Sequence, residues 1–316
     1  MQITGSNFPS KMMTDISANT GWEGYELLAT GNGQRLERWC GRVILRPETA
    51  AQWPWHHPES LPAWEGRYTG NHATGGVWEW KHPLPDPCIV RYKSLSLLVK
   101  PTNSKHLGLF PEQSANWEWI TGVIREAMDA STAGNATPKV LNLFGYTGGA
   151  TLAAAAAGAS VTHVDAARAM VGWCSDNARL SGLGDAPIRY IVEDAVTFLQ
   201  RENRRGNRYD GIIMDPPAFG RGKGGELWKL SDHLPFLIDI AQEALSDSPL
   251  FLLLNTYSDS LDDLSESMIS RKLNRLGGSS EVVGLGLTGS LDHQRLPLGK
   301  AHRWSVREPE DPGKGS

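Results

Sequence analysis

The sequence lacks the long apolar stretch that a membrane-spanning helix needs. Its longest apolar runs, at Leu152–Ala157 and Leu250–Leu254, fall far short of the ~18 residues that cross a bilayer. The first twenty residues also lack the apolar core of a secretory signal peptide, and we expect them to be loosely held. These absences predict a protein without membrane insertion.

Cysteine is scarce as well. The chain has three cysteines, Cys40, Cys88 and Cys174, and none of them belongs to a CxxC pair. This excludes a disulfide framework and a zinc site built on cysteine, and it indicates the reducing cytoplasm. His56 and His57 have no third ligand at helical or hairpin spacing, so we predict no metal site.

Neither sign of charge dominates, which excludes a polycationic binder of nucleic acid. Lys and Arg number 31 against 35 Asp and Glu, for a net charge of −4. Residues 1–110 contain 11 basic and 9 acidic residues, and the remainder contains 20 and 26. Any phosphate contacts would therefore come from a local patch.

The chain changes character near residue 106. The part before it combines Gly, Pro and short β-like runs, including Trp39–Arg46, Gly76–Trp80, Ile89–Tyr92 and Leu95–Lys100. These runs predict a small, mostly β domain over residues 1–106. Nine of the 12 tryptophans precede residue 120, which favours anchoring in a β-rich core. A stacking platform for bases is the alternative interpretation.

Residues 107–307 alternate between strand-like and helix-like segments. Strands are predicted at 139–144, 160–165, 188–193, 209–215 and 250–256, with two closing strands near 281–287 and 301–306. Helices are predicted at 112–130, 150–158, 167–180, 195–204, 232–245 and 260–276. This alternation predicts an α/β domain whose parallel sheet has helices on both faces. We expect residues 308–316 to form a disordered tail.

The ends of the predicted strands form the candidate site, because ligands of such sheets bind beyond the carboxyl ends of the strands. The first strand leads into the glycine turn Gly145–Gly149. Its glycines let the backbone approach a ligand closely. The next strands end in Asp165, in Glu193-Asp194 and in Asp215. Asp165 suits the two hydroxyls of a ribose. Asp194 is equally well interpreted as the N-cap of the next helix.

Asp215-Pro216-Pro217-Ala218-Phe219 is the most specific of these segments. Two prolines directly after an apolar strand end the strand and define a rigid turn. The turn offers the Asp215 side chain and the Pro216 carbonyl as acceptors, with the ring of Phe219 nearby. Such a site can orient an amino or imino group on a planar ring.

With these motifs in place, residues 106–306 resemble class I S-adenosylmethionine-dependent methyltransferases. The nearest resemblance is to bacterial large-subunit ribosomal RNA methyltransferases of the I/K type. The matching segments are His106–Gln113, Val140–Gly148, Val164–Ala166 with Asn177, Glu193-Asp194 and Asp215–Phe219. The resemblance implies a Rossmann-like methyltransferase sheet preceded by the small β domain, with S-adenosylmethionine as cofactor and ribosomal RNA as substrate. We expect no amino-terminal PUA module, since too few residues precede the β domain.

The resemblance also implies roles for individual residues. It assigns the cofactor's methionine and ribose part to Phe144, Gly145, Tyr146, Thr147 and Gly148. Asp165 would hold the ribose hydroxyls, Asp194 the adenine amine, and Phe110 and Gln113 would close over the cofactor. It assigns the methyl-acceptor side to Asp215, Pro216, Pro217 and Phe219.

One departure from the family pattern bears on mechanism. Members that methylate cytosine at carbon 5 place a nucleophilic cysteine in a Thr/Ser-Cys-Ser motif after the fifth strand, because carbon 5 needs covalent activation. The corresponding segment here is Asn255-Thr256-Tyr257-Ser258, with tyrosine at the cysteine position. This predicts methylation without a covalent intermediate, at a nitrogen or an oxygen.

Three alternatives stay open at this stage. The acceptor could be a small molecule or a protein. The chain could be a catalytically inactive relative that still binds the cofactor. A dinucleotide-dependent oxidoreductase also uses a glycine turn and a distal Asp, but it leaves the Asp-Pro-Pro turn unexplained. The sequence does not specify the oligomeric state.

Overall fold

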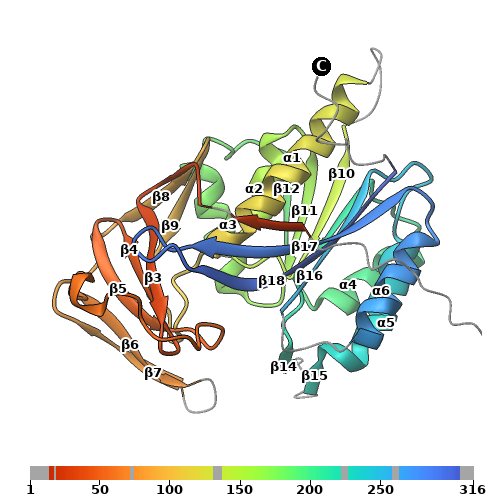
Figure 1. Cartoon of the computed structure of the whole chain (residues 1–316). Coiled ribbons are helices and arrows are strands. Elements are labelled where there is room, and N and C mark those ends of the chain that lie inside the picture. The colour runs from red at the N-terminus through yellow and green to blue at the C-terminus, as the bar shows by residue number, and fades with distance from the viewer. Residues whose placement is uncertain are drawn as a thin grey trace, which may run out of the picture.

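The computed structural model describes residues 14–17, 19–71, 75–130, 137–221, 227–257 and 263–306. Figure 1 shows a mostly β part beside a larger part in which helices surround a twisted sheet. None of the helices in these ranges is long and apolar enough to cross a membrane.

An eight-stranded sheet forms the centre of the larger part, in the order β1-β17-β18-β16-β13-β10-β11-β12. Five strands run parallel: β10 (Lys139–Leu143), β11 (Ser160–Asp165), β12 (Ile188–Val192), β13 (Gly211–Met214) and β16 (Phe251–Thr256). The long hairpin of β17 (Ser279–Thr288) and β18 (Arg295–Ser305) extends the sheet, with β18 antiparallel to β16. The chain order reverses between β10 and β13, the place where such sheets bind ligands.

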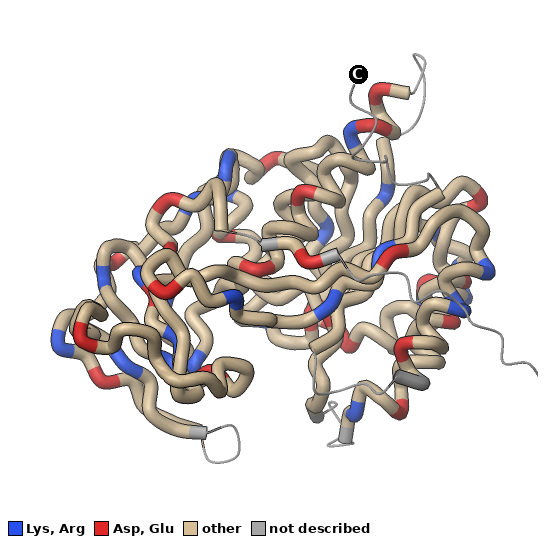
Figure 2. The backbone as a smooth tube through the Cα atoms, viewed as in Figure 1, with Lys and Arg blue, Asp and Glu red and all other residues tan. Residues whose placement is uncertain are grey.

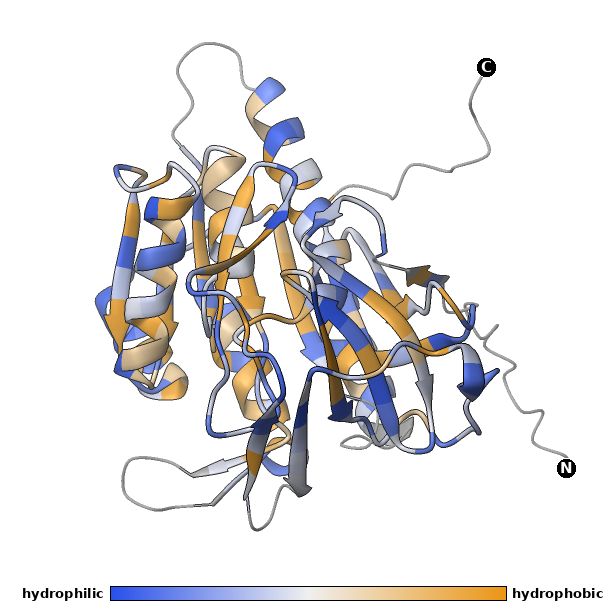
Figure 3. Cartoon of the chain, turned by 90° about the vertical axis from the view of Figure 1, so that its left-hand side faces the viewer, coloured by the Kyte–Doolittle hydropathy of each residue, from blue (hydrophilic) through white to orange (hydrophobic). Residues whose placement is uncertain are grey.

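Helices cover both faces of this sheet: α1 (Ser114–Asp129), α2 (Gly149–Ala156), α3 (Arg168–Leu180), α4 (Ala195–Arg205), α5 (Leu230–Glu243) and α6 (Asp263–Asn274). Alternate residues of the strands point to opposite faces. Thus Leu252 and Leu254 pack in one core with α4, α5 and α6, whereas Leu253 packs in another with α1 and α2. In Figure 3 the apolar colour follows the strands and the helix faces next to them. The predicted α/β sheet with helices on both faces is confirmed.

The β part contains a five-stranded and a three-stranded sheet. The first consists of β3 (Tyr25–Gly31), β4 (Gln34–Trp39), β5 (Arg42–Pro47), β6 (Gly66–Asn71) and β7 (Gly75–Trp80), and the second of β2 (Trp22–Glu23), β8 (Cys88–Tyr92) and β9 (Leu95–Val99). Trp39 is completely buried between them. The same apolar cluster continues into Trp117 of α1 and Cys174 of α3. The two parts therefore share a core.

Short elements complete the described chain. The 3₁₀ turns are η1 (Pro58–Ser60) and η2 (Pro111–Gln113), and the latter leads directly into α1. A small hairpin of β14 (Phe219–Arg221) and β15 (Leu227–Lys229) follows the Asp-Pro-Pro turn.

Two expectations need correction, and a third falls outside the described part of the chain. The run Trp39–Arg46 is not one strand, because Cys40 and Gly41 have φ of 47° and 82° and form the β4–β5 turn. Residues Thr14–Ser17 are not loosely held, since they form β1 parallel to β17. The expected tail, residues 308–316, lies outside the described residues.

The expectation of unpaired cysteines is also wrong. Cys40 and Cys88 form a disulfide with a Cα–Cα distance of 5.9 Å, across 48 residues of sequence. The β4–β5 turn brings Cys40 beside the first residue of β8, a proximity that cysteine spacing alone does not reveal. Cys174 is the remaining free thiol, and it is buried.

Charged side chains are buried together in the five-stranded sheet. Arg46 donates two hydrogen bonds to Glu37, at 2.6 and 2.9 Å, and Arg35 lies 3.7 Å from both Glu37 and Glu48. Burial alone would raise the pKa of Glu37, but Arg35 and Arg46 outweigh it and lower the pKa to about 2. Because this pKa is below the unfolded value, its contribution to stability is present above pH ~4.5 and is lost as the pH falls towards 2.

We expect Arg46→Ala to lower the free energy of unfolding by about 3–5 kcal/mol, because buried Glu37 would lose both of its hydrogen bonds from Arg46 and keep Arg35 at 3.7 Å. The matched control is Arg38→Ala in the neighbouring strand, whose ion pair with Glu26 is 42% and 39% exposed. That change should cost less than about 1 kcal/mol. Urea denaturation at pH 7 measures both values, and equal losses would contradict the interpretation of the buried cluster.

Candidate active site

The turn between β10 and α2 forms one wall of the candidate site. Phe144 and Tyr146 adopt left-handed backbone conformations, with φ of 56° and 50°, and Gly148 has φ of 93°. A side chain on Gly148 would also collide with Cys174, since an added Cβ would lie 2.2 Å from its Sγ. Left-handed non-glycine residues are strained and gather at functional sites. Two such residues in one turn indicate a conformation that the surrounding structure enforces.

Hydrogen bonds from three directions hold this turn. The Tyr146 N–H donates to Asp165 Oδ2 of β11 at 2.9 Å. The Asn177 side chain of α3 donates to the Thr147 carbonyl at 2.9 Å, and the Thr147 hydroxyl donates to the Gly108 carbonyl at 2.6 Å. The predicted glycine turn is thus hydrogen-bonded to β11, to α3 and to the segment that leads into η2.

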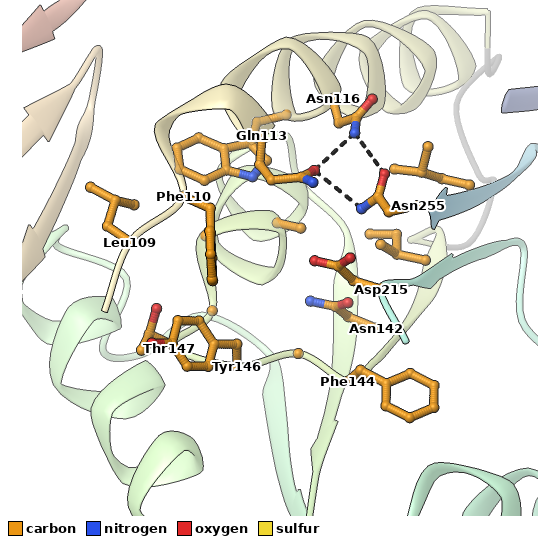
Figure 4. A pocket seen from close by; sticks show the side chains of 17 residues that line it. Leu109, Phe110, Gln113, Asn116, Asn142, Phe144, Tyr146, Thr147, Asp215 and Asn255 are labelled. Carbon is orange, nitrogen blue, oxygen red and sulfur yellow. Dashed lines mark hydrogen bonds between the residues drawn. The ribbon is translucent and has the colours of Figure 1, made fainter. Parts of the chain in front are cut away.

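A pocket opens beside this turn, at the point where the strand order reverses (Figure 4). Eight of the predicted site residues line it: Phe110, Gln113, Phe144, Gly145, Tyr146, Thr147, Gly148 and Asp215. The lining also includes residues that were not predicted, among them Asn116, Trp117, Asn142 and Asn255. The pocket therefore brings together η2, α1 and the carboxyl ends of β10, β13 and β16.

The other predicted acidic residues lie outside this lining. Asp165 accepts the N–H of Ala167 with Oδ1, at 2.8 Å, in addition to that of Tyr146 with Oδ2. Burial raises the pKa of Asp165, and these two backbone hydrogen bonds oppose the rise. Asp194 is the N-cap of α4, where its Oδ1 accepts from the backbone N–H and the hydroxyl of Thr197 at 2.8 and 3.0 Å.

Asp215 is the acidic residue that faces the pocket. It follows the buried strand β13, and its Oδ1 accepts a hydrogen bond of 2.7 Å from the Tyr257 hydroxyl. Burial raises the pKa of Asp215 to about 6, while the hydrogen bonds from Tyr257 and Asn255 lower it. The carboxylate is thus close to its titration range at neutral pH.

Three amides form a network above Asp215 (Figure 4). The Asn116 amide donates to Gln113 Oε1 and to Asn255 Oδ1, both at 2.9 Å, and Asn255 Nδ2 donates to Gln113 Oε1 at 3.1 Å. Buried Arg303 donates to Asn116 Oδ1 from Nε at 3.1 Å and from Nη2 at 2.8 Å. Because a guanidinium has donors only, it fixes the orientation of the Asn116 amide and so of the other two.

The Asp-Pro-Pro turn continues into the β14–β15 hairpin rather than into the pocket lining. The Pro217 carbonyl accepts from the Trp228 indole N–H at 2.8 Å. Trp228 lies 6.0 Å from the ring of Phe144, centroid to centroid. Phe219 is 65% exposed. Pro216, Pro217 and Phe219 therefore lie next to the pocket, and Trp228 is an aromatic neighbour that was not predicted.

The described residues contain no group of three or more His, Cys, Asp or Glu side chains that could hold a metal ion. The pocket offers amides, the Asp215 carboxylate, aromatic rings and the beginning of α2, which suit an organic ligand.

Comparison with known proteins decides the family. A sequence model of S-adenosylmethionine-dependent methyltransferases matches residues 116–234. The crystal structure of a SAM-dependent methyltransferase from Agrobacterium tumefaciens is 37% identical in sequence, with 97% of each chain covered and a TM-score of 0.84. This chain belongs to the S-adenosylmethionine-dependent methyltransferases.

Curated relatives of this methyltransferase match a shorter segment. Ribosomal RNA large subunit methyltransferase K from Neisseria meningitidis is 37% identical over 134 residues, or 40% of this chain and 36% of the relative. Ribosomal RNA large subunit methyltransferase I from Aeromonas salmonicida is 29% identical over 139 residues, or 44% of this chain and 32% of the relative. The aligned segment is about a third of each of these relatives.

The pocket of this methyltransferase fits the chemistry of S-adenosylmethionine. The first turn of α2 offers backbone N–H groups that suit a carboxylate. The rings of Phe110 and Tyr146, 5.4 Å apart, suit a sulfonium cation. Asp165 lies at the end of the adjacent strand, where a carboxylate can accept from hydroxyls.

The sequence contains only a weak signal for the amide side chains that were not predicted. Asn142 and Asn255 interrupt otherwise apolar strands, KVLNL and FLLLNT, near their carboxyl ends. A polar residue there is costly to bury without a partner, so its position next to the order reversal is a usable indication. Asn116 lies within an amphipathic helix, and nothing in its local sequence distinguishes it.

We expect Asp165→Ala to weaken the binding of S-adenosylmethionine at least tenfold. The change removes the acceptor that holds the Tyr146 N–H, and a hydrogen bond to a charged group contributes about 1.5–3 kcal/mol. Isothermal titration calorimetry measures the dissociation constant.

The matched control for this prediction is Asp210→Ala. Asp210 also accepts a backbone N–H, from Lys139 at 2.8 Å, but at the opposite end of β10. Its replacement should lower stability and leave cofactor affinity unchanged. Equal losses of affinity in the two variants would contradict a local role for Asp165.

Proposed function

We propose that this chain transfers a methyl group from S-adenosylmethionine to a base of ribosomal RNA, without a covalent cysteine intermediate. The observation on which the proposal depends is the Asp215 carboxylate. It lines the pocket and accepts a hydrogen bond from Tyr257, which stands at the cysteine position of carbon-5 methyltransferases. The names of the curated relatives support RNA as the substrate class.

The states of the cysteines support a mechanism without a covalent intermediate. Cys40 and Cys88 are joined in the disulfide. Cys174 is buried behind the glycine turn, and burial raises the pKa of its thiol. A nucleophilic cysteine needs access and a thiolate, so none of the three is suited to attack a base.

For cofactor binding we propose that the turn from Phe144 to Gly148 contacts the methionine and ribose part. Asp165 would accept from the ribose hydroxyls, since each of its oxygens has a further lone pair beyond its backbone hydrogen bond. Asp194 would accept from the adenine amine through Oδ2, because capping of α4 uses Oδ1. Phe110 and Gln113, from the segment between the two parts, would close the pocket.

For the acceptor we propose that Asp215 and the Pro216 carbonyl orient the base, with the exposed ring of Phe219 as a stacking face. S-adenosylmethionine supplies, when bound, an electrophilic methyl group on a sulfonium sulfur. The residues of this chain align the nucleophile with that group and exclude water. The amide network above Asp215 keeps these acceptors in a single orientation.

The β part, residues 1–106, is proposed to contact the RNA outside the pocket. Basic and acidic residues are interspersed along the described backbone (Figure 2). Trp64 combines an aromatic face with two cations, as Arg67 and Lys81 lie 4.6 and 3.7 Å from its ring centroid. Such a combination suits the bases and phosphates of a single strand.

The proposed activity is tested with methyl-labelled S-adenosylmethionine. Total RNA and protein extract from a strain that lacks this gene serve as the two substrates. Label in ribosomal RNA, followed by mapping of the methylated nucleoside to a nitrogen or an oxygen, is the expected result. Label in protein only, or label at carbon 5 of cytosine, would contradict the proposal.

We expect Asp215→Ala to retain S-adenosylmethionine binding within about threefold while methyl transfer to RNA falls at least 100-fold, the size typical of lost acid–base contacts. The control is Asp239→Ala on the outer side of α5, where the carboxylate is 57% exposed. Its transfer rate should equal that of the unaltered protein. If Asp215→Ala kept full turnover, the acceptor assignment would be wrong.

A further inference from the structure

Tyr257 stands at the cysteine position of carbon-5 methyltransferases and contacts the central carboxylate of the site. The residue directly follows β16, and its hydroxyl donates a hydrogen bond of 2.7 Å to Asp215 Oδ1. The resemblance to carbon-5 methyltransferases identified this position only as one that had lost a cysteine. In the structure, the tyrosine side chain at this position binds the Asp215 carboxylate.

Gly299 of the neighbouring strand β18 leaves space for the Tyr257 ring. Gly299 of β18 has φ of 145°, and an added Cβ would lie 2.9 Å from the Thr256 carbonyl oxygen and 3.4 Å from Tyr257 Cδ1. A larger residue at this point would displace the chain that leads into Tyr257. The absence of a side chain on Gly299 thus leaves space beside the phenol ring, and Asp215 binds its hydroxyl.

We propose that Tyr257 is a positioning residue that keeps Asp215 ionised and oriented as the proton acceptor of the methylation step. This role rests on the proposed function and makes it more specific. It assigns the acceptor to a base nitrogen that bears a hydrogen, because such a nitrogen must release a proton when it is methylated.

Methylation of such a nitrogen forms one bond, breaks one bond and releases one proton. The lone pair of the nitrogen forms the new bond to the methyl carbon while the carbon–sulfur bond breaks and its electron pair stays on sulfur. S-adenosylhomocysteine is the leaving group. The methylated nitrogen then becomes acidic, and its proton passes to Asp215. Because each carboxylate oxygen has two lone pairs, Asp215 keeps an acceptor position for that proton beside its hydrogen bond from Tyr257.

The charges around the pair agree with this role. Burial raises the pKa of Asp215 to about 6, and the hydrogen bonds from Tyr257 and Asn255 lower it. Burial and Asp215 together hold the pKa of Tyr257 well above its usual value, so the phenol stays a donor. Among the described residues, the other ionisable group that acts on Tyr257 is Glu112 of η2, whose pKa burial raises to about 7.

The test is the pH profile of kcat for Tyr257→Phe, with methyl-labelled S-adenosylmethionine and total RNA from the strain that lacks this gene. Loss of the hydrogen bond disfavours the carboxylate, so the pKa of Asp215 rises and the acid limb moves up by about one pH unit. The rate should fall about fivefold at pH 6 and approach that of the unaltered protein at pH 9. The KM for S-adenosylmethionine should not change.

Glu112→Gln is the matched control, since it removes the other nearby group that titrates close to neutrality. Its acid limb should coincide with that of the unaltered protein. A merely structural role for Tyr257 would lower kcat equally at every pH, and that result would overturn the proposal. So would an acid limb that moves in Glu112→Gln and stays in place in Tyr257→Phe.

A second measurement does not depend on RNA. The titration of the Asp215 carboxyl carbon is followed by ¹³C NMR and assigned with Asp215→Asn. Its midpoint should rise in Tyr257→Phe and remain in Glu112→Gln, and an unmoved midpoint in Tyr257→Phe refutes the proposal even if RNA is methylated. If the midpoint moves but the unaltered protein labels no RNA, the proposed function fails and the action of Tyr257 on Asp215 stands.

Discussion

The active site depends on one constrained turn, the segment that joins β10 to α2. Two non-glycine residues in it, Phe144 and Tyr146, have left-handed backbones, and each such residue costs about 1–3 kcal/mol. The turn persists because Asp165, Asn177 and the Gly108 carbonyl each bind a different group of it. These partners belong to β11, to α3 and to the segment before η2, so the turn forms only when all three are in place.

The same dependence joins the β part to the catalytic part. The apolar cluster around Trp39 extends to Trp117 of α1, and an added Cβ on Gly149 would lie 2.3 Å from the Trp117 ring. The beginning of α2, which borders the pocket, is therefore packed directly against a residue of the shared core. A change in how the β part sits on α1 would reach the pocket through this contact.

A network of hydrogen-bonded amides orders the opposite wall of the pocket. Arg303 of β18 can only donate, so the Asn116 oxygen must accept and its amide must donate to Gln113 and Asn255. The orientation of three amides is thus settled by one buried guanidinium. Beneath them, Asp215 receives hydrogen bonds from two residues at the end of β16, Asn255 and Tyr257. The Asp215 carboxylate and its surroundings are specified together.

Much of the larger part could be predicted, because the local periodicity of its apolar residues indicates its strands and helices. The predicted strand at 160–165 coincides with β11, and the other parallel strands differ only at their ends. The β part was predicted less well, since its short strands have weak patterns. There the run Trp39–Arg46 divides at a turn whose two left-handed residues include a cysteine.

The sequence by itself determined the α/β class, the glycine turn and the acidic strand ends, because each depends on residues that are close together in the chain. Only the tertiary structure decided which of them share a pocket. The Cys40–Cys88 disulfide spans 48 residues, the Tyr257–Asp215 hydrogen bond 42 and the Asn116–Asn255 hydrogen bond 139. Such contacts form when helices, strands and turns that are distant in the chain pack against one another, and no local sequence pattern indicates which of them will meet.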